Sequence, residues 1–556
     1  MYTKLQADVT IVGGGLAGLN AAIAAAEQGA RVVIMDKARI EHSGNIAGGV
    51  DHFMAYLDEG ESWDTREAYL GFVKEAAYGA VNLKIHERVF CDELDAALER
   101  TARIGSPMHD PATGKYYRTR AFGMPGPYWI NFDGKNLKPN LAREARRLGC
   151  KVLDWVTTTK FFVRDQRVVG VSGVNIRDGN FYFVESSAIV AATGNTNRLY
   201  ETPTGMPFNT WLCPYDTGAA QSLAFEAGAR LANMEYLRMT IVPKGFSAPG
   251  LNAYTGEGAV FINGLGERYM ERYHRLKDKA PRNVLVYAAL MEIKEGRGPL
   301  FLDCRHLPTA NLEKLKGTLG TDKETLPDYF AQKGIDIAQE PFEVEVSEGM
   351  QTGPIEVVGA GIQIDERCMS SIAGLFGAGD CADQMKVVHM AVTGGYAAGR
   401  SAAQYALRNP TDGLPEAEVL AEQSRALAPL QRNTGLHYRE VEDVLRKIMK
   451  EYVGPMRTEI GLQTAAKKIS RLKQEVPHLK AANPHELMRC LETENLIAIG
   501  EIMAQAALAR KESRFIPYHY RLDYPERDDQ NWCGQIVVWQ KGEEIETDFQ
   551  RLDYGG

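Results

Sequence analysis

Short apolar runs and one longer alanine-rich segment alternate at the start of the chain. Val9–Val12 and Val32–Met35 are short runs rich in β-branched residues, a pattern typical of buried strands. Between them, small apolar residues from about Ala17 to Gln28 predict a helix, because only Asn20 and Glu27 interrupt the run. The chain is therefore predicted to open with a strand–helix–strand unit.

Three glycines with G-x-G-x-x-G spacing separate the first strand from the helix. Gly13 permits a tight turn, Gly15 lets a pyrophosphate approach the backbone, and Gly18 lets helix and strand pack closely. Asp36 ends the second strand, where a carboxylate can accept hydrogen bonds from ribose hydroxyls. This order predicts a dinucleotide site, with a purely structural βαβ unit as the alternative. The pattern alone does not choose between FAD and NAD, but its place at the start of a long chain favours FAD.

The next segments show both helical and strand periodicity. Residues 41–50 are rich in small residues and form either a loop against a flat ring or an ordinary surface turn. A buried strand over Ser187–Gly194 closes on a glycine, so its end can meet the dinucleotide from the other side. The other predicted elements are helices over 62–105 and Asn136–Leu148, and strands over Lys151–Val163, Arg167–Ile176 and Asn180–Val184.

The second half of the chain changes character several times. From Arg238 to about Val346, glycine loops and charge-rich stretches predict an inserted domain. Residues 353–380 return to strands and glycines, and a short helix is predicted to begin near Thr393. From Pro415 to Arg510 the pattern is mostly long helices, followed by an aromatic, strand-like tail.

Composition and charge restrict the function classes. The chain has 556 residues, of which 44% are hydrophobic and 24% charged, so several structural units are expected. The net charge of −8 argues against a nucleic-acid-binding surface. We find no transmembrane segment in the sequence, and the first strand begins too early for a leader peptide, so a cytoplasmic protein is expected.

The eight cysteines are scattered and include no C-x-x-C pair. A disulfide framework, a zinc site or an iron–sulfur cluster in this chain is therefore not expected. If electrons leave by an iron–sulfur route, another chain must hold the clusters.

Several stretches, taken in order, resemble the flavoprotein subunits of the fumarate reductase and succinate dehydrogenase superfamily. They are the opening glycine motif, Ala-Ala-Thr-Gly at 191–194, the Gly-Glu-Gly-Ala-Val run that starts at 256, Gly-Leu-Phe-Gly-Ala-Gly-Asp at 374–380, and 523–532. The resemblance implies an α/β fold with a split Rossmann-like FAD-binding domain, an inserted α+β capping domain and a C-terminal helical domain. The implied ranges are 1–237 and 351–410 for the FAD-binding domain, 238–350 for the capping domain, and 411–556 for the helical domain and tail.

Within this superfamily the chain is most similar to adenylylsulfate reductase alpha subunits. The similarity lies in His-Ser-Gly-Asn-Ile-Ala-Gly-Gly at 42–49, Asn-Thr-Trp-Leu-Cys-Pro-Tyr-Asp at 209–216 and Pro-Tyr-His-Tyr-Arg-Leu-Asp-Tyr-Pro at 517–525. It implies a ferredoxin-like partner that carries 4Fe–4S clusters and a small anionic substrate, and it leaves a higher oligomer open.

The same resemblance implies which residues bind FAD, with Asp380 at the ribityl chain. The histidine that holds flavin covalently in relatives corresponds to Ser43 or Gly44, so non-covalent FAD is expected, with no metal in this chain. The predicted FAD contacts are Gly13, Gly14, Gly15, Ala17, Gly18, Asp36, Lys37, Ser43, Gly44, Gly48, Val156, Ala192, Thr193, Gly194, Asp216, Gly379, Asp380, Thr393 and Gly394.

The chain departs from the dicarboxylate enzymes of the superfamily at three places. Thr255 stands where they carry a proton-donating Arg, and Met239–Val242 replaces their His-Pro-Thr run. Their later Arg has no counterpart at Val392–Gly395. A site for two carboxylates would therefore lack its cationic clamps, which disfavours fumarate reduction.

His389 and Arg238 are the predicted catalytic residues, because both correspond to substrate-pocket positions of adenylylsulfate reductase. His389 could protonate or hydrogen-bond a leaving oxyanion, or it is a structural histidine near the flavin ring. Arg238 could grip an anion with two donors, or it forms an interdomain ion pair. Weaker candidates are the cations Lys244 and Arg268 and the aromatic residues Trp211, Tyr215 and Tyr128, which line the pocket or belong to the core.

These observations predict an FAD-dependent oxidoreductase that exchanges two electrons between a small anionic substrate and an iron–sulfur partner. Two alternatives stay open: a soluble reductase of fumarate or another unsaturated acid, and a non-catalytic flavin electron-transfer component of a larger complex. The non-catalytic alternative predicts bound FAD but no cations in a substrate pocket.

Overall fold

A computed structural model describes residues 2–110, 112–120, 124–246, 251–322, 325–411 and 413–553. Its central element is a seven-stranded sheet in the order β6-β2-β1-β9-β8-β7, with β18 also paired to β9. Strands β6, β2, β1, β9 and β18 are parallel, whereas β7 and β8 are antiparallel additions. The bounds are β1 (Thr3–Val12), β2 (Val32–Asp36), β6 (Lys151–Asp154), β7 (Val156–Arg164), β8 (Arg167–Asn175), β9 (Phe181–Ala191) and β18 (Leu375–Gly377).

The register of this sheet brings the ends of distant strands to one edge. Val12 of β1 lies opposite Met35 of β2 and Ala191 of β9, and Ala191 lies opposite Gly377 of β18. The residues after these four strands therefore share the carboxyl edge of a parallel sheet, which is where such folds bind ligands.

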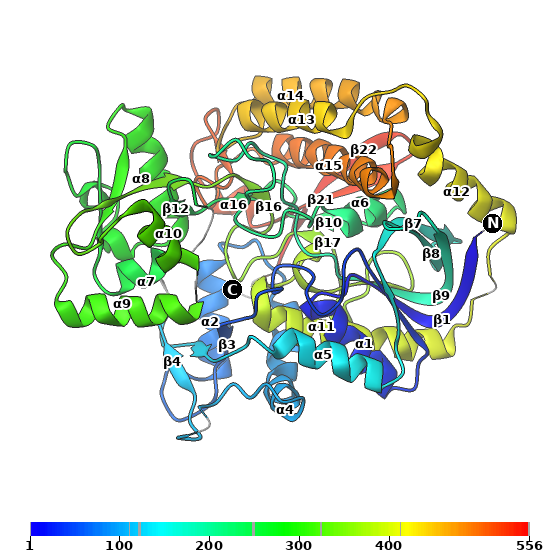
Figure 1. Ribbon diagram of the computed structural model, residues 1–556, viewed down its shortest axis with the longest axis horizontal. Coiled ribbons are helices and arrows are strands. Elements are labelled where there is room, and N and C mark those ends of the chain that lie inside the picture. The colour runs from blue at the N-terminus through cyan, green and yellow to red at the C-terminus, as the bar shows by residue number, and fades with distance from the viewer. Residues whose placement is uncertain are drawn as a thin grey trace.

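Two helices pack against each other beside this edge. In α1 (Leu16–Glu27) every residue from Leu16 to Ala25 is buried, which small side chains allow. A Cβ on Gly395 of α11 (Val387–Arg408) would meet Ala17, and one on Gly399 would meet Ala21, so the helices run parallel and in close contact. Figure 1 shows α1 and α11 together, with α5 (Leu137–Arg147) beside α1.

Two sequence predictions about these elements were wrong in detail. The strands predicted over Asn180–Val184 and Ser187–Gly194 are one strand, β9, because no turn residue interrupts 181–191. The helix predicted to start near Thr393 begins at Val387, so His389 lies in its first turn and not before it. Sequence reasoning placed the start at the glycines, but here glycines lie inside the helix because another helix packs on them.

The segment between β11 (Leu237–Arg238) and β16 (Met350–Gln351) forms its own sheet and helices, at the left of Figure 1. The sheet is antiparallel in the order β12-β15-β14-β13. Its elements are β12 (Ile241–Pro243), β13 (Val260–Ile262), β14 (Leu300–Asp303) and β15 (Phe342–Val346), with α7 (Leu251–Gly256), α8 (Arg282–Lys294), α9 (Thr309–Asp322) and α10 (Thr325–Lys333). The domain boundaries drawn from the sequence stay a prediction.

Long helices form one edge of the molecule in Figure 1, and the C-terminal strands return to the body of the protein. Strand β21 pairs with β10, so the tail joins a second sheet in the order β17-β10-β21-β22. The elements are α12 (Glu416–Gln431), α13 (Tyr438–Tyr452), α14 (Glu459–Lys473), α15 (Pro484–Ala509), α16 (Asp529–Trp532), β10 (Leu231–Ala232), β17 (Gly361–Ile362), β19 (Met456–Arg457), β20 (Tyr520–Arg521), β21 (Gly534–Lys541) and β22 (Glu544–Arg551).

The segment 62–105, predicted to be helical, is divided into several pieces. A π-helical turn over His86–Phe90 and a 3-10 turn over Cys91–Glu93 interrupt it. The remaining elements are α2 (Arg66–Ala76), α3 (Leu83–Ile85), α4 (Leu94–Arg103), α6 (Ala219–Glu226), and the small sheet of β3 (His52–Met54), β4 (Tyr117–Thr119) and β5 (Trp129–Asn131). None of the helices, as far as the structure describes them, has the length and apolar character needed to cross a bilayer.

Candidate active site

The three glycines of the opening motif have different surroundings. Gly13 has a φ of +99°, and a Cβ there would lie 2.4 Å from the carbonyl oxygen of Ala192. A Cβ on Gly18 would lie 1.8 Å from the carbonyl oxygen of Gly13, so tight packing excludes a side chain at both positions. Around Gly15, by contrast, none of the described residues comes within 4 Å of the Cβ position.

The open space at Gly15 lies at the N-terminus of α1. Gly15 is the N-cap residue, and no side chain caps the helix. The first amides of a helix and its positive dipole end suit an anion such as a pyrophosphate. The loop that contains Gly44 lies next to Gly15, because a Cβ on Gly44 would lie 4.0 Å from Gly15 Cα. Gly48 of the same loop also borders open space. This uncapped helix start under a glycine loop fits the phosphates of FAD.

The carboxylate of Asp36 is held by the chain around it. Its Oδ2 accepts hydrogen bonds from the backbone NH of Gly14 at 2.6 Å and from Ser43 Oγ at 2.9 Å, and its Oδ1 accepts from the NH of Ala38 at 2.7 Å. Lys138 Nζ donates to Ser43 Oγ at 2.7 Å. Since a carboxylate oxygen can accept two hydrogen bonds, Oδ1 retains capacity for a ribose hydroxyl. Sequence reasoning missed Lys138, which lies on α5 and is not part of the glycine motif.

The end of β9 meets the glycine turn from the other side. The NH of Ala192 donates to the carbonyl of Val12 at 2.8 Å, and Thr193 Oγ1 accepts from the NH of Ala220 at 3.0 Å. A Cβ on Gly194 would lie 2.8 Å from Asp216 Oδ2. Burial raises the pKa of Asp216 to about 7, which the nearby Lys37 opposes. The side chain of Lys37 itself donates to Glu492 Oε1 at 2.7 Å.

The segment around Asp380 lies beside the opening motif. Gly379 has a φ of +70°, and its Cβ would lie 2.9 Å from Ala17 Cβ. Asp380 Oδ1 accepts a hydrogen bond at 3.0 Å from the NH of Val387, the first residue of α11. The starts of α1 and α11 therefore lie on one side of the sheet edge. Asp380 lies where these two helix starts meet, and its contact with the ribityl chain of FAD stays a prediction.

Several other predicted FAD contacts have packing roles in the structure. Ala17 faces α11, as its closeness to Gly379 and Gly395 shows. Thr393 Oγ1 donates to the carbonyl of His389 at 3.1 Å, and Gly394 leaves room for the side chain of Gln384. Val156 is buried at the start of β7. Whether these residues also touch FAD stays a prediction.

His389 is enclosed completely in the first turn of α11. It is 0% exposed, and the rings of Phe53 and Phe90 lie with their centroids 6.0 and 5.8 Å from its own. Neither ring nitrogen has a hydrogen-bond partner among the described residues. Burial lowers the pKa of His389 to about 3, so the ring is neutral near pH 7. Two unpartnered nitrogens on a buried ring are rare, and a water, an ion or a ligand would satisfy them.

An ion cluster close to the start of α11 contains Arg238, Arg282 and Glu356. We call Arg238 and Arg282 the arginine pair, and Glu356 is the carboxylate that they share. Both guanidinium groups bond Glu356 Oε1, Arg282 at 3.2 Å. Burial would raise the pKa of Glu356, but the two arginines outweigh it and lower the pKa to about 2. The ring of Trp211 lies 5.8 Å from Arg238 and 5.7 Å from Arg282. The Nε atoms of both arginines have no partner among the described residues.

Lys386 ties this cluster to α11. Its NH donates to the carbonyl of Glu356 at 2.9 Å, and its ammonium group bonds Thr352 Oγ1. Burial lowers the pKa of Lys386 to about 8. Sequence reasoning missed Lys386, Arg282 and Glu356, because they share no motif and come together only in space.

Trp211 is positioned by a buried acid. Its backbone NH donates to Glu348 Oε1 at 2.6 Å, and burial raises the pKa of Glu348. The indole lies within cation–π distance of both arginines, and its role as a pocket wall stays a prediction. Tyr128, by contrast, is a core residue with 0% exposure whose hydroxyl donates to the carbonyl of Trp63.

The remaining candidates lie on the surface. Lys244 is exposed and pairs with Glu343 at 2.6 Å, and Tyr215 is 43% exposed. Arg268 is exposed as well and precedes a 3-10 turn. Among the residues that the structure describes, no three His, Cys, Asp or Glu side chains are grouped to hold a metal ion.

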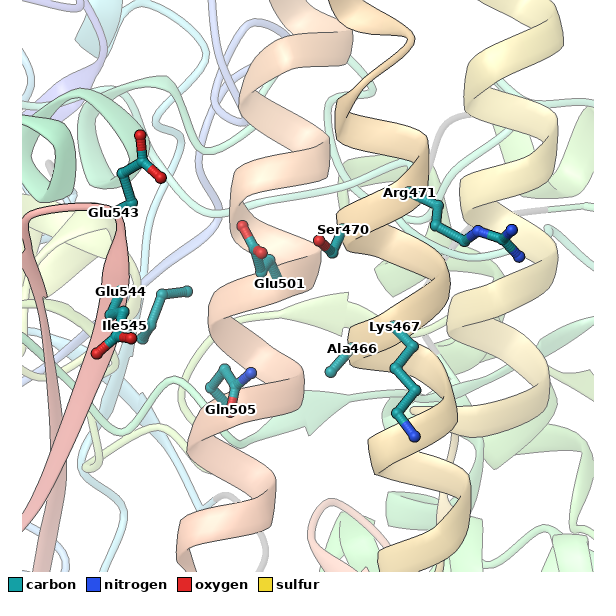
Figure 2. Close-up of a pocket in the computed structure, with 9 residues that line it drawn as sticks. All are labelled: Ala466, Lys467, Ser470, Arg471, Glu501, Gln505, Glu543, Glu544 and Ile545. Carbon is teal, nitrogen blue, oxygen red and sulfur yellow. The ribbon is translucent and has the colours of Figure 1, made fainter.

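A groove of about 760 Å³ lies elsewhere, between α14, α15 and the β21–β22 hairpin. Figure 2 shows Glu543 on the hairpin and Glu501 on α15 at its sides, while Arg471 points away from the hairpin. None of its lining residues is a predicted site residue. The arginine pair and His389 likewise lie outside this groove.

Known families and proteins match nearly the whole chain. Residues 8–397 match the FAD binding domain family, and residues 442–555 match the fumarate reductase flavoprotein C-terminal family. An uncharacterised FAD-dependent oxidoreductase of Methanocaldococcus jannaschii is 28% identical over 99% of this chain and 98% of its own length. One of the subunits of the fumarate reductase (CoM/CoB) of Methanothermobacter marburgensis is also 28% identical, over 97% of this chain and 98% of its own.

The fold has a close match among solved structures. Adenylylsulfate reductase of Archaeoglobus fulgidus superposes with a TM-score of 0.87 at 23% identity, covering 100% of this chain and 98% of that one. At this identity the match confirms the predicted fold and does not extend to the substrate. The glycine turn at residues 13–18 and the matched families together show that the chain belongs to the fumarate reductase and succinate dehydrogenase flavoprotein family of FAD-dependent oxidoreductases.

Proposed function

We propose that this flavoprotein exchanges two electrons between a small anionic substrate and an iron–sulfur partner, in the manner of the adenylylsulfate reductase alpha subunit. The observation that carries the proposal is the arginine pair, whose shared carboxylate, Glu356, acts electrostatically on His389. Two guanidinium groups whose buried Nε atoms lack partners, together with a histidine whose two ring nitrogens lack partners among the residues that the structure describes, are the groups with which the chain would recognise an anion.

FAD, when bound, supplies the electron pair or accepts it. The chain's own residues hold the substrate: Arg238 and Arg282 bind the anionic group, and Trp211 walls the pocket. His389 is neutral, so it serves as a hydrogen-bond donor or acceptor toward a substrate oxygen and is not a resident imidazolium. It transfers a proton only if the charge that develops on the substrate raises its pKa. The enclosing Phe53 and Phe90 keep water away from the ring.

The iron–sulfur partner is proposed from the cysteines. All eight are free thiols, and Cys213 and Cys533 alone are not buried. A route for electrons through clusters therefore requires another chain. The Methanothermobacter relative is named as one subunit of its fumarate reductase, which supports an arrangement with a separate partner chain.

Both alternatives from the sequence can be weighed against the site. A non-catalytic electron-transfer component would need no cations in its pocket, and the presence of Arg238, Arg282 and Lys386 together opposes it. Reduction of fumarate is favoured by the relatives' names, but the clamps that the dicarboxylate enzymes carry at Thr255 and Val392–Gly395 are missing here.

One experiment separates the three functions. The holoenzyme is reduced anaerobically, and reoxidation of its flavin is followed with adenylylsulfate, fumarate and oxidised ferredoxin in turn. Rapid reoxidation by adenylylsulfate supports the proposal, as does rapid reoxidation by ferredoxin when an anion is bound to the flavoprotein. Reoxidation by fumarate alone supports the unsaturated-acid reductase, and exchange with ferredoxin without any small acceptor supports the electron-transfer component.

A further inference from the structure

We infer that Lys138 is a cofactor-binding residue whose ammonium group supplies positive charge to the pyrophosphate of FAD. This role concerns the cofactor and not the substrate, so it goes beyond the proposed function and applies to each of the three candidate functions. Lys138 lies on α5, outside the glycine motif, and no sequence pattern points to it.

The ammonium group of Lys138 lies at the loop that borders the phosphate space. Its Nζ donates to Ser43 Oγ at 2.7 Å and also bonds the carbonyl oxygen of Ser43. The next residue, Gly44, adjoins Gly15 at the uncapped start of α1, where the space beside the backbone is open. Ser43 Oγ in turn donates to Asp36 Oδ2 at 2.9 Å. The lysine is therefore connected to both sides of the predicted dinucleotide site.

Lys138 is a buried cation without a paired acid. The residue is 1% exposed, and the oxygens of Ser43 are its hydrogen-bond partners among the described residues. Asp36 and Asp216 act on the ammonium group through space, but no carboxylate in the described part of the chain forms an ion pair with it. Buried lysines are normally paired, and an ammonium group has three donors, of which Ser43 engages two. One donor and an unpaired positive charge therefore remain for an anionic ligand.

The placement of this cation is costly while no anion is bound. Lys138 lies in the first turn of α5, where the positive end of the helix dipole disfavours a cation. Burial lowers the pKa of the ammonium group to about 8, so the group is still mainly cationic near pH 7. A phosphate oxygen would offset both effects, because a charge-assisted hydrogen bond is stronger than a neutral one.

The neighbouring groups supply little further positive charge to a pyrophosphate. Lys37 donates to Glu492 Oε1 at 2.7 Å, so its charge is already paired. The N-terminus of α1 contributes about half an elementary charge. The carboxylate of Asp36 adds negative charge to the site, and each phosphate of a pyrophosphate carries a further negative charge. Lys138 stays available to balance them, whereas Lys37 does not.

The test compares the apoprotein and the FAD-bound form of the full-length chain. Lys138→Met keeps the length of the side chain and removes its charge. Its apoprotein should have a thermal midpoint equal to or above that of the wild-type apoprotein, because a buried unpaired cation is gone. Its Kd for FAD, measured by quenching of flavin fluorescence, should rise at least about tenfold. FAD should therefore raise the thermal midpoint less in the variant than in the wild type.

Two further variants separate the charge from the anchoring of the loop. Ser43→Ala keeps the ammonium group and removes the hydroxyl link to Asp36, so it should weaken FAD binding less than Lys138→Met does. Lys450→Met is the control, because Lys450 is an exposed lysine on α13 that pairs with Glu201 at 2.7 Å, and it should leave the Kd unchanged.

Three outcomes would overturn the role of Lys138. A fall in the thermal midpoint of the Lys138→Met apoprotein, or failure of this variant to fold, would assign the lysine to the fold alone. An unchanged Kd for FAD would show that the charge is not felt by the cofactor. Equal weakening by Ser43→Ala and Lys138→Met would leave the lysine as an anchor of the loop, without a part in balancing the pyrophosphate.

Discussion

Two clusters of buried charge in this protein have opposite designs. In the first, which we call the helical-domain network, Glu492 of α15 bonds Lys37, Arg198 and Arg489 at 2.7, 2.9 and 2.7 Å. Both of its oxygens are used. In the second, the arginine pair shares one oxygen of Glu356, and the Nε atoms of both arginines have no partner among the described residues.

The difference separates a structural role from a binding role. The carboxylate of Glu492 is 1% exposed and has cations on both oxygens, so no ligand can reach it. Glu356 is partly open to solvent and lies beside orphaned donors. Unpartnered Nε atoms occur in both clusters, on Arg198 as on Arg238 and Arg282, so the contrast rests on how far solvent reaches each carboxylate. Four predictions test this distinction, in order of expected size.

The largest effect is expected for Glu492→Gln. It leaves the buried Arg198 and Arg489 and the partly exposed Lys37 without their shared carboxylate, and breaking a buried pair of this kind destabilises by about 3–5 kcal/mol. Because Lys37 also lies near Asp216 in the predicted FAD site, the amount of FAD that the protein retains should fall too. Urea denaturation and the FAD content after gel filtration measure both effects. Glu501→Gln, which removes a surface pair with Lys473, is the control and should change neither.

Arg238→Met should reduce catalysis more than stability. Arg282 would still pair with Glu356, so the fold keeps an ion pair, but the anion loses one of its two guanidinium groups. We expect a loss of about 100-fold in kcat/KM, or about 2.7 kcal/mol, with the substrate found by flavin reoxidation. Lys244→Met is the exposed control. A variant with a large fall in thermal midpoint and normal kcat/KM would assign Arg238 to the structure alone.

His389→Leu should change the pH dependence of stability. The pKa of His389 is lowered to about 3, below the ordinary value of 6.5, so the neutral ring contributes stability that is fully present above pH 6.5. That contribution is lost as pH falls from about 6.5 toward 3, at up to about 1.4 kcal/mol per pH unit. The variant should lose less unfolding free energy than the wild type over this range in urea titrations at several pH values. A wild-type slope retained in the variant, as in the exposed His42→Leu control, contradicts the burial of a neutral ring.

The smallest effect on the fold is expected for Gly15→Ala. Its φ of −68° suits alanine, and the added methyl group meets open space, so the thermal midpoint of the apoprotein should not change. FAD affinity should fall about tenfold, or about 1.4 kcal/mol, because the methyl group lies where a pyrophosphate approaches. Gly18→Ala is the contrasting variant, since its methyl group would collide with the carbonyl of Gly13 and prevent folding. Equal FAD affinity for Gly15→Ala and wild type would place the phosphates elsewhere.

The sequence by itself determined the parts of the molecule that depend on local pattern. The strand, glycine turn, helix and strand follow from β-branched runs, glycines and alanines. The helix lies within one residue of its predicted ends, whereas β1 begins at Thr3, earlier than the predicted Val9. The same holds for the helices between Pro415 and Arg510. Local order also identified the family, because glycine and acid positions recur in a fixed order along the chain.

Only the tertiary structure decided which groups meet. Arg282 on α8 and Glu356 after β16 are 74 residues apart, and no periodicity connects them. The start of α11 was misplaced because glycines, which end or begin most helices, here serve the contact with α1. The neutral state of His389 depends on Phe53 and Phe90, which come from other segments. Charge balance and burial are sums over distant residues, so the chain has to fold before either is defined.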